Sequence, residues 1–335
     1  MYISPRPILP PGGTEEQGLL LKGKILTVLK IAVSLGLIAY LFTRMDLAQV
    51  SRVLQSANYL YLLPAALFFL GAMSSFGLKW YILLRAQGIY VPFQAVLSYT
   101  YVGYFFNNFL PGNVGGDVMR GYGLARYTEQ AAEAALSVVV DRIVGLMAWV
   151  SAAVVMAAVV VWVMGRDDLK EIEVAAFVGL GVIAAGFAVI LSRRLRALGG
   201  RVVAWKPLSP FAPLYDRLSE GLNAYRHSFG ALALAFCMSL LALTLANLTD
   251  YFIVQSLGGG IPFVYIFLFN PIIAFVLLVP VSVGGLGVTQ AAYPFFYGLV
   301  GVPSTLAFTV SLLKQLVVYV TSLPGGALWW RRRVG

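Results

Sequence analysis

Blocks of about twenty apolar residues alternate with short polar segments along most of this chain. The uninterrupted blocks cover residues 24–43, 59–79, 134–164, 174–192, 229–255 and 305–328. A helix of about twenty residues is long enough to cross the ~30 Å hydrocarbon core of a membrane. The pattern therefore predicts an all-α integral membrane protein with about six transmembrane helices.

Two further apolar stretches, 94–116 and 263–300, are broken by prolines, glycines and amides. The breaks are Asn107, Asn108, Pro111, Gly112, Asn113, Gly115 and Gly116 in the first stretch, and Asn270, Pro271, Pro280, Gly284, Gly285 and Gly287 in the second. Such breaks leave backbone N–H and C=O groups unpaired, and lipid cannot satisfy them. They are tolerated only inside protein or beside a water-filled cavity. Both stretches are therefore predicted to form re-entrant or broken helix hairpins.

The charges in the polar segments predict an orientation. Residues 193–227 carry seven basic and two acidic side chains, and 331–335 is a basic tail, so both are expected in the cytoplasm. Residues 166–173 carry four acidic and two basic side chains and are expected outside. This arrangement makes both termini cytoplasmic if 94–116 enters and leaves on the cytoplasmic side and 263–300 does so on the other. If 94–116 crossed once instead, 166–173 would lie inside.

A weak internal repeat agrees with two hairpins. Residues 110–117 and 279–286 share Pro, Val, Gly and Gly without a gap, at an offset of 169 residues. Paired interrupted segments in inverted halves are the best sequence indication of a transporter substrate site. We expect one membrane domain over 24–330, built from inverted halves at about 24–165 and 174–330, after a disordered segment 1–23.

Composition supports a membrane protein and excludes several kinds of site. The chain has 335 residues, of which 60% are hydrophobic and 11% charged, whereas soluble domains carry about 25% charged residues. The net charge of +10 suits anionic lipid, and no soluble basic domain is available to bind nucleic acid. Because the chain has one cysteine, Cys237, and one histidine, His227, we expect no disulfide, metal site or cofactor.

Short motifs identify a resemblance. The string FLPGNVGGD at 109–117 is followed by Arg120, the next helix carries Asp141-Arg142, and VGGLGV follows at 283–288. These motifs resemble the lysylphosphatidylglycerol synthase transmembrane-region family over roughly 24–330. The resemblance implies a membrane domain that translocates lipids, in some members fused to a soluble aminoacyl-lipid synthase. We expect no synthase domain, because the chain ends five residues after Trp330.

Two positions depart from the family pattern. Gln290 stands where the family usually has an acidic residue, and Lys314 where the last helix usually has arginine. Lysine keeps the positive charge but loses the bidentate fork that suits phosphate. The head group of the lipid is therefore expected to differ.

Lys314 is the strongest single candidate for a functional side chain. It is the only charge in 305–328 and lies ~14 Å along the helix from its outer end, close to the membrane midplane. A charge at that depth is costly and is functional by default. The alternative is a lysine whose stem reaches an interface. Asp250, near the outer end of 229–255, either pairs with Lys314 or lies at the membrane interface.

A second candidate site follows the first glycine break. Free N–H groups at Gly115 and Gly116, together with Arg120 and neighbouring Asp117, would form an anion site for a lipid phosphate. The alternative is that these glycines only permit close helix packing. Asp141 and Arg142 either line the same cavity or form an ion pair at the membrane interface. The remaining candidates, which either bind the head group or satisfy broken backbone, are Asn108, Gly284, Gly285 and Gln290.

The sequence thus predicts transbilayer translocation of an anionic phospholipid or a polyprenyl-phosphate-linked lipid. The protein would be a multi-pass, non-enzymatic component of a bacterial or archaeal inner membrane, and a homo-oligomer is compatible with the sequence. Transport would be driven by an ion gradient or be downhill, and the candidates for proton coupling are Asp117, Asp141 and Asp250. Two alternatives stay open, a membrane transferase that acts on a polyprenyl-phosphate-linked substrate and a non-catalytic scaffold for lipid modification.

Overall fold

The computed structural model describes residues 32–37, 39–41, 43, 45–108, 115–192, 225, 228–279 and 281–334, and in these ranges the chain is almost entirely helical. The helices are α2 (Leu47–Gln55), α3 (Leu62–Ala86), α4 (Phe93–Asn107), α5 (Gly115–Thr128), α6 (Ala131–Ala158), α7 (Lys170–Leu191), α10 (Phe229–Ser256), α11 (Phe263–Val276), α12 (Val288–Gly298) and α13 (Ser304–Val334). Short 3₁₀ turns at Tyr59–Tyr61 and Asp167–Leu169 precede α3 and α7. The predicted disordered segment, most of the basic segment 193–227 and the motif residues 109–114 lie outside the described residues.

The long helices confirm the prediction of an all-α membrane protein. Among the described residues, Tyr59–Ala86, Ala131–Val163, Phe229–Ser256 and Ser304–Arg331 are long and apolar enough to cross a membrane. The second of these includes a π-helical turn at its C-terminal end. Helix α7 has 22 residues and no charged side chain from its fifth residue onward. The predicted first span is described in part, as an apolar helix over Ala32–Leu41.

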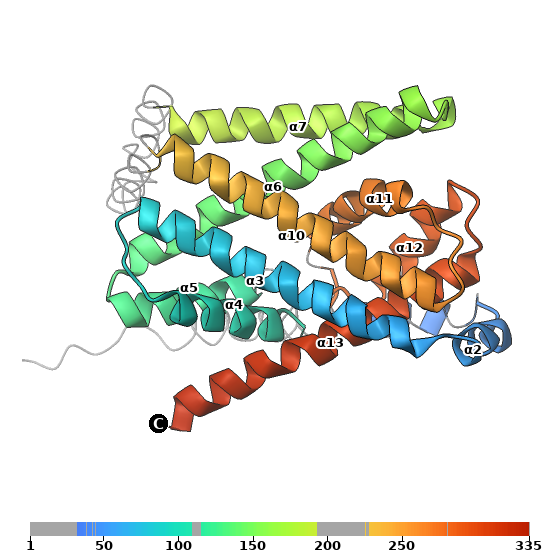
Figure 1. Ribbon diagram of the computed structural model, residues 1–335, viewed down its shortest axis with the longest axis horizontal. Coiled ribbons are helices and arrows are strands. Elements are labelled where there is room, and N and C mark those ends of the chain that lie inside the picture. The colour runs from blue at the N-terminus through green and yellow to red at the C-terminus, as the bar shows by residue number, and fades with distance from the viewer. Residues whose placement is uncertain are drawn as a thin grey trace, which may run out of the picture.

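The two interrupted stretches form helix hairpins that enter from opposite ends of the bundle. Helices α4 and α5 form one hairpin, and it enters from the end where α13 finishes (Figure 1). Helices α11 and α12 enter from the other end, and α3 and α10 run in opposite directions (Figure 1). Shifting α3 and α4 by 169 residues gives 231–255 and 262–276, within two residues of the observed α10 and α11. The arrangement of the described helices agrees with two hairpins in inverted halves, and the membrane side of each hairpin stays a prediction.

Glycines allow the two helices of the first hairpin to touch. A Cβ added at Gly103 of α4 would lie 2.8 Å from the carbonyl oxygen of Gly116, and one added at Gly116 would lie 2.1 Å from the carbonyl oxygen of Gly103. A Cβ at Gly123 of α5 would lie 2.6 Å from the ring of Tyr99. Any larger side chain at these positions would push the helices apart. Gly116 therefore permits close helix packing, and its part in a phosphate site stays a prediction.

Helix α13 packs equally closely on the first hairpin, which joins the two halves. A Cβ at Gly325 would lie 2.1 Å from the carbonyl oxygen of Tyr101 on α4, and one at Gly326 would lie 2.7 Å from the ring of Phe105. Because α13 belongs to the second half, this contact holds the two halves together beside the hairpin tips. The predicted basic tail begins as the last turn of this helix.

Helix α2 was not predicted. Its nine residues mix apolar and polar side chains, so they form no continuous apolar block. Asp46 caps the helix by accepting a hydrogen bond from the backbone N–H of Gln49, 3.0 Å away. Thr305 at the start of α13 donates to the Gln49 side chain over 2.9 Å. This short helix therefore covers the end of the bundle from which the second hairpin enters.

Candidate functional site

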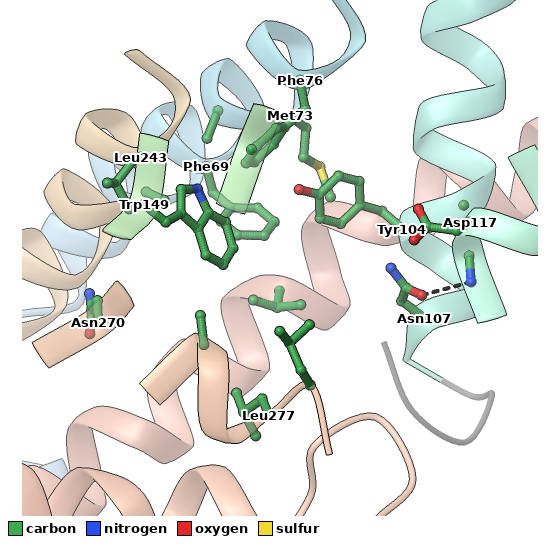
Figure 2. Close-up of a pocket in the computed structure, with 18 of the residues that line it drawn as sticks. Phe69, Met73, Phe76, Tyr104, Asn107, Asp117, Trp149, Leu243, Asn270 and Leu277 are labelled. Carbon is green, nitrogen blue, oxygen red and sulfur yellow. Dashed lines mark hydrogen bonds between the residues drawn. The ribbon is translucent and has the colours of Figure 1, made fainter. Parts of the chain in front are cut away.

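A cavity of about 320 Å³ lies between the hairpins and is lined by both halves of the protein. Figure 2 shows Asp117 and Asn107 at one end and Asn270 at the other, with Tyr104 and Trp149 between them. The predicted site residues that line it are Asn108, Gly116, Asp117, Arg120, Asp141, Arg142, Gly284 and Lys314. The cavity therefore brings together candidates that are up to about two hundred residues apart in the sequence.

The first end of the cavity holds a charged cluster of five side chains, Lys79 on α3, Asp117 and Arg120 on α5, and Asp141 and Arg142 on α6. Asp141 binds two cations: its Oδ1 lies 2.9 Å from the ammonium of Lys79 and its Oδ2 lies 2.7 Å from Nη2 of Arg120. Asp117 also binds two, because its Oδ1 lies 2.9 Å from Arg120 and its Oδ2 accepts from Arg142. We call these residues the five-charge cluster.

Burial makes the pairing in the five-charge cluster necessary. The side chain of Lys79 is 3% exposed, and those of Asp141 and Arg120 are also buried. A buried charge is tolerated only when it is paired and hydrogen-bonded. Three cations face two carboxylates, so the cluster carries a net charge of +1 when all five groups are ionised. Arg142 is its most exposed member, at 33%, and lines the cavity.

Asp141 and Arg142 therefore line the cavity, which settles the choice left open by the sequence. Asp117 and Arg120 share one face of α5, as their spacing of three residues predicted. The guanidinium of Arg120 also stacks on the Trp80 ring, 4.9 Å from its centroid. These contacts fix the position of Arg120 from two sides.

Sequence reasoning missed Lys79. The apolar block was predicted to end at residue 79, but α3 continues to Ala86 and Lys79 is buried within it. The prediction was wrong because a hydropathy pattern does not distinguish a buried, paired charge inside a helix from a charge that ends an apolar block. A window extended to Leu83 and Leu84 would have shown that apolar residues continue after the lysine.

The second end of the cavity holds a smaller polar cluster around Asp250, which we call the Asp250 cluster. Oδ2 of Asp250 lies 2.7 Å from the ammonium of Lys314, and it accepts hydrogen bonds from Tyr293 over 2.9 Å and from Asn270. Lys314 also donates to the Tyr293 hydroxyl over 2.6 Å. Asn270 donates to the side chain of Asn247 over 2.8 Å, and Tyr297 donates to Asn270 over 3.2 Å.

The predicted pairing of Lys314 with Asp250 is confirmed. The snorkelling alternative is wrong, because the ammonium is held by Asp250 and Tyr293 rather than by an interface. Lys314 is 26% exposed and lines the cavity, whereas the Asp250 side chain is 1% exposed. Sequence reasoning missed Asn247 and Tyr293. The sequence indicates them only weakly: Asn247 stands three residues before Asp250, and Tyr293 stands three residues after Gln290, so each shares a helix face with a candidate.

The hairpin breaks are satisfied by nearby amides. The N–H of Gly116 donates to Oδ1 of Asn107 over 2.7 Å (Figure 2), so the predicted free N–H at Gly116 is wrong. Asn108 donates to the hydroxyl of Ser322 on α13 over 2.7 Å. Gln290 accepts from the N–H of Gly287 over 2.7 Å at the start of α12, which leaves it outside the cavity lining. Gly115 is the first residue of α5.

The tips of the two hairpins touch at one glycine. Gly284 has a φ of +56°, and a Cβ there would lie 2.6 Å from the backbone carbonyl oxygen of Asn108. Gly285 also has a positive φ, +74°. A residue with a side chain would be strained at Gly284 and would clash with the first hairpin. Among the described residues, no three His, Cys, Asp or Glu side chains are placed to hold a metal ion.

Comparisons with known proteins agree with this architecture. The sequence is 24% identical over 324 residues to a UPF0104 membrane protein of Pyrococcus horikoshii, covering 91% of this chain and 97% of the relative. A UPF0104 membrane protein of Methanothermobacter thermautotrophicus is 23% identical over 317 residues, covering 89% and 91% of the two chains. Residues 27–325 match the lysylphosphatidylglycerol synthase transmembrane region. The chain therefore belongs to the lysylphosphatidylglycerol synthase transmembrane-region family and is a multi-pass membrane protein.

Proposed function

We propose that this protein moves lipids with an anionic, phosphate-bearing head group across the membrane by way of the cavity between its hairpins. The observation that carries the proposal is the cavity lining itself. Cations from both halves, Arg142 from one and Lys314 from the other, face a single cavity inside a membrane domain. Ionisable groups at such depth are costly, and they mark the path of a substrate or ion.

The charge of the five-charge cluster supports an anionic substrate. Its net +1 would be neutralised by one phosphodiester, which also carries one negative charge. Arg142 is the partly exposed member, and a guanidinium offers phosphate two parallel hydrogen bonds. The other two cations, Lys79 and Arg120, are buried against the carboxylates and serve to hold Asp117 and Asp141 in place.

The size of the cavity supports a head group rather than a whole lipid. At about 320 Å³ it holds the liquid volume of about ten water molecules, at the low end of small-molecule pockets. Lipid chains would stay outside, along the apolar faces of the bundle. Aromatic side chains on the cavity wall, among them Phe76, Tyr104 and Trp149, would separate the polar ends of the path.

The opposed hairpins support alternating access from the two membrane faces. Each hairpin enters from one end, and their tips meet where Gly284 touches the Asn108 carbonyl (Figure 1). In transporters with inverted repeats, rocking of one half against the other opens a central site alternately to each side. By the charge pattern of the sequence, the first hairpin and both termini would face the cytoplasm.

The test is lipid movement in proteoliposomes, measured by dithionite quenching of fluorescently labelled phosphatidylglycerol or labelled polyprenyl phosphate. Arg142→Gln is the informative variant, because Asp117 keeps Arg120 as a partner and the fold is preserved. A lost charge-assisted hydrogen bond of about 1.5–3 kcal/mol would slow movement about tenfold to a hundredfold. Arg126→Gln, an exposed arginine on the neighbouring helix α5, is the control and should retain the full rate.

Two results would contradict the proposal. If the wild-type protein moves neither lipid faster than empty liposomes do, the proposed function is refuted. If Arg142→Gln moves lipid as fast as Arg126→Gln, the proposal that the five-charge cluster binds the phosphate is refuted. Mass spectrometry of the lipids after the assay separates movement from chemistry, because a changed lipid mass would favour the transferase alternative instead.

A further inference from the structure

The two carboxylate oxygens of Asp250 have unequal surroundings. Oδ2 receives Lys314, Tyr293 and Asn270, as described above. Oδ1 is fully buried and has no hydrogen-bond partner among the described residues. An unpaired buried carboxylate oxygen carries most of its desolvation penalty uncompensated. A proton on Oδ1 removes that penalty, because it neutralises the carboxylate.

The other two candidate aspartates differ from Asp250 in their counter-ions, although Oδ1 of Asp141 is, like Oδ1 of Asp250, buried without a hydrogen-bond partner among the described residues. Asp117 has Arg120 beside Oδ1 and Arg142 beside Oδ2. Asp141 has Lys79 beside Oδ1 and Arg120 beside Oδ2. Each of these carboxylates therefore has a cation beside both of its oxygens. Asp250 has one cation at one oxygen.

The groups that face Asp250 come from every helix around it. On α13 the charged group is Lys314, and on α12 the titratable groups are Tyr293 and Tyr297. Helix α11 contributes neutral Asn270, and α10 itself contributes neutral Asn247. On the neighbouring helices α3 and α6, the charged side chains at cavity depth belong to the five-charge cluster and pair within it. Lys314 is therefore the counter-ion of Asp250.

We propose that Oδ1 of Asp250 is a proton-binding site, and that proton uptake there releases Lys314 to the phosphate of the lipid. This inference rests on the proposed lipid movement and adds the coupling ion to it. A proton from water in the cavity bonds to Oδ1, and the neutral carboxyl no longer holds the ammonium. Lys314, which already lines the cavity, then pairs with the phosphate.

The charges balance in this exchange. Before it, the carboxylate and the ammonium cancel, and the lipid phosphate carries one negative charge. After it, the ammonium and the phosphate cancel, and the proton has neutralised the carboxyl. One proton thus accompanies each phosphate charge into the site, and loss of the proton restores the Asp250–Lys314 pair and expels the phosphate. Tyr293, bonded to both Lys314 and Asp250, keeps the two groups in reach of each other.

The first test detects the proton directly and does not depend on lipid movement. Infrared difference spectra of the reconstituted protein, recorded on acidification, should show the C=O stretch of a buried protonated carboxylic acid. In protein labelled with ¹³C-aspartate the band should shift, which assigns it to aspartate in the wild-type chain. It should vanish in Asp250→Asn and persist in Asp168→Asn, an exposed aspartate at the start of α7.

The second test measures coupling. Lipid movement by the wild type should change with pH, by at most about tenfold per pH unit for one titrating group. In Asp250→Asn, Lys314 is permanently released and nothing expels the phosphate, so lipid movement should be slow and should not respond to pH.

The outcomes separate this inference from the proposed function. Absence of a shifted band in labelled wild-type protein overturns the inference even if the variant fails to fold, and so does a band that survives in Asp250→Asn. Lipid movement with no pH response would likewise overturn it and leave the proposed function standing. The expected band in a protein that moves no lipid would leave the proton site standing and refute the proposed function.

Discussion

Replacing Lys314 with methionine should destabilise the protein as well as stop lipid movement. Methionine conserves the volume but leaves Asp250, whose side chain is 1% exposed, without its cation. Removing one partner of a buried ion pair costs about 3–5 kcal/mol, because the remaining charge stays buried and uncompensated. From the sequence alone, Lys314→Met is expected to fold normally. The contact with Asp250 changes that expectation.

A second substitution should restore the stability. In Lys314→Met/Asp250→Asn both charges are gone, and replacing a buried pair by neutral groups is often neutral or stabilising. The double-mutant cycle should therefore give a coupling of at least about 2 kcal/mol, towards the upper end of the range for residues in contact. The double variant should move lipid at least about tenfold more slowly than the wild type, because no ammonium group remains to bind the phosphate. Lys314→Arg keeps the charge and should retain activity.

The measurements are the free energy of unfolding in mixed micelles and the dithionite assay on the same preparations. Lys170→Met is the matched control, because the Lys170 side chain is 56% exposed and pairs with the exposed Asp167 three residues earlier. Loss of such a surface pair costs about 0–1 kcal/mol. A coupling near zero would refute the energetic role of the Lys314–Asp250 pair. A stable double variant that moves lipid at the wild-type rate would refute the role of Lys314 in binding.

Two further predictions test the hairpins. Gly103→Ala should cost about 1–3 kcal/mol of stability, because its Cβ would lie 2.8 Å from a backbone carbonyl oxygen of α5, whereas Gly36→Ala meets nothing within 4 Å. Thermal unfolding of the two variants compares them, and equal midpoints would contradict the close packing of α4 and α5. In a cysteine-free background, Tyr90→Cys and Gln130→Cys flank the first hairpin and should react with an impermeant maleimide from the same side of the membrane. Asp168→Cys should react from the opposite side; labelling of the two flanking positions from different sides would remove the hairpin.

Much of the fold could be predicted because its determinants are local. Apolar length predicts the long helices, and the breaks near Asn107 and Asn270 predict the hairpins, since lipid cannot satisfy unpaired backbone. The direction of each hairpin followed from loop charge and from the repeat. Lys314 stood out because it is one charge in an otherwise apolar block.

The parts that were missed depend on contacts between distant segments. Lys79 is stable inside α3 only because Asp141 lies 62 residues later and within 2.9 Å, and a hydropathy pattern contains no information on that distance. The N–H of Gly116 was expected to be free, but Asn107 turns back across the break to accept its hydrogen bond. Polar side chains at a helix break bond first to the unpaired backbone groups of that break. Only the structure shows which polar side chains remain available to bind a ligand.

The two ends of the cavity differ in a way that suits transport better than a symmetric site would. In the five-charge cluster every carboxylate oxygen has a cation beside it, so its positive charge is fixed. In the Asp250 cluster the Asp250–Lys314 pair is balanced and Oδ1 of Asp250 has no hydrogen-bond partner among the described residues, so on our proposal the charge of this cluster changes with one proton. Two fixed cationic ends would hold a phosphate tightly and release it slowly. The five-charge cluster would attract the phosphate at all times, whereas the Asp250 cluster would attract it only while Lys314 is released. This difference allows the same lipid to be bound and then released. The backbone repeats in the two halves, but the side chains at their centres do not, and the inference of directional release depends on that difference.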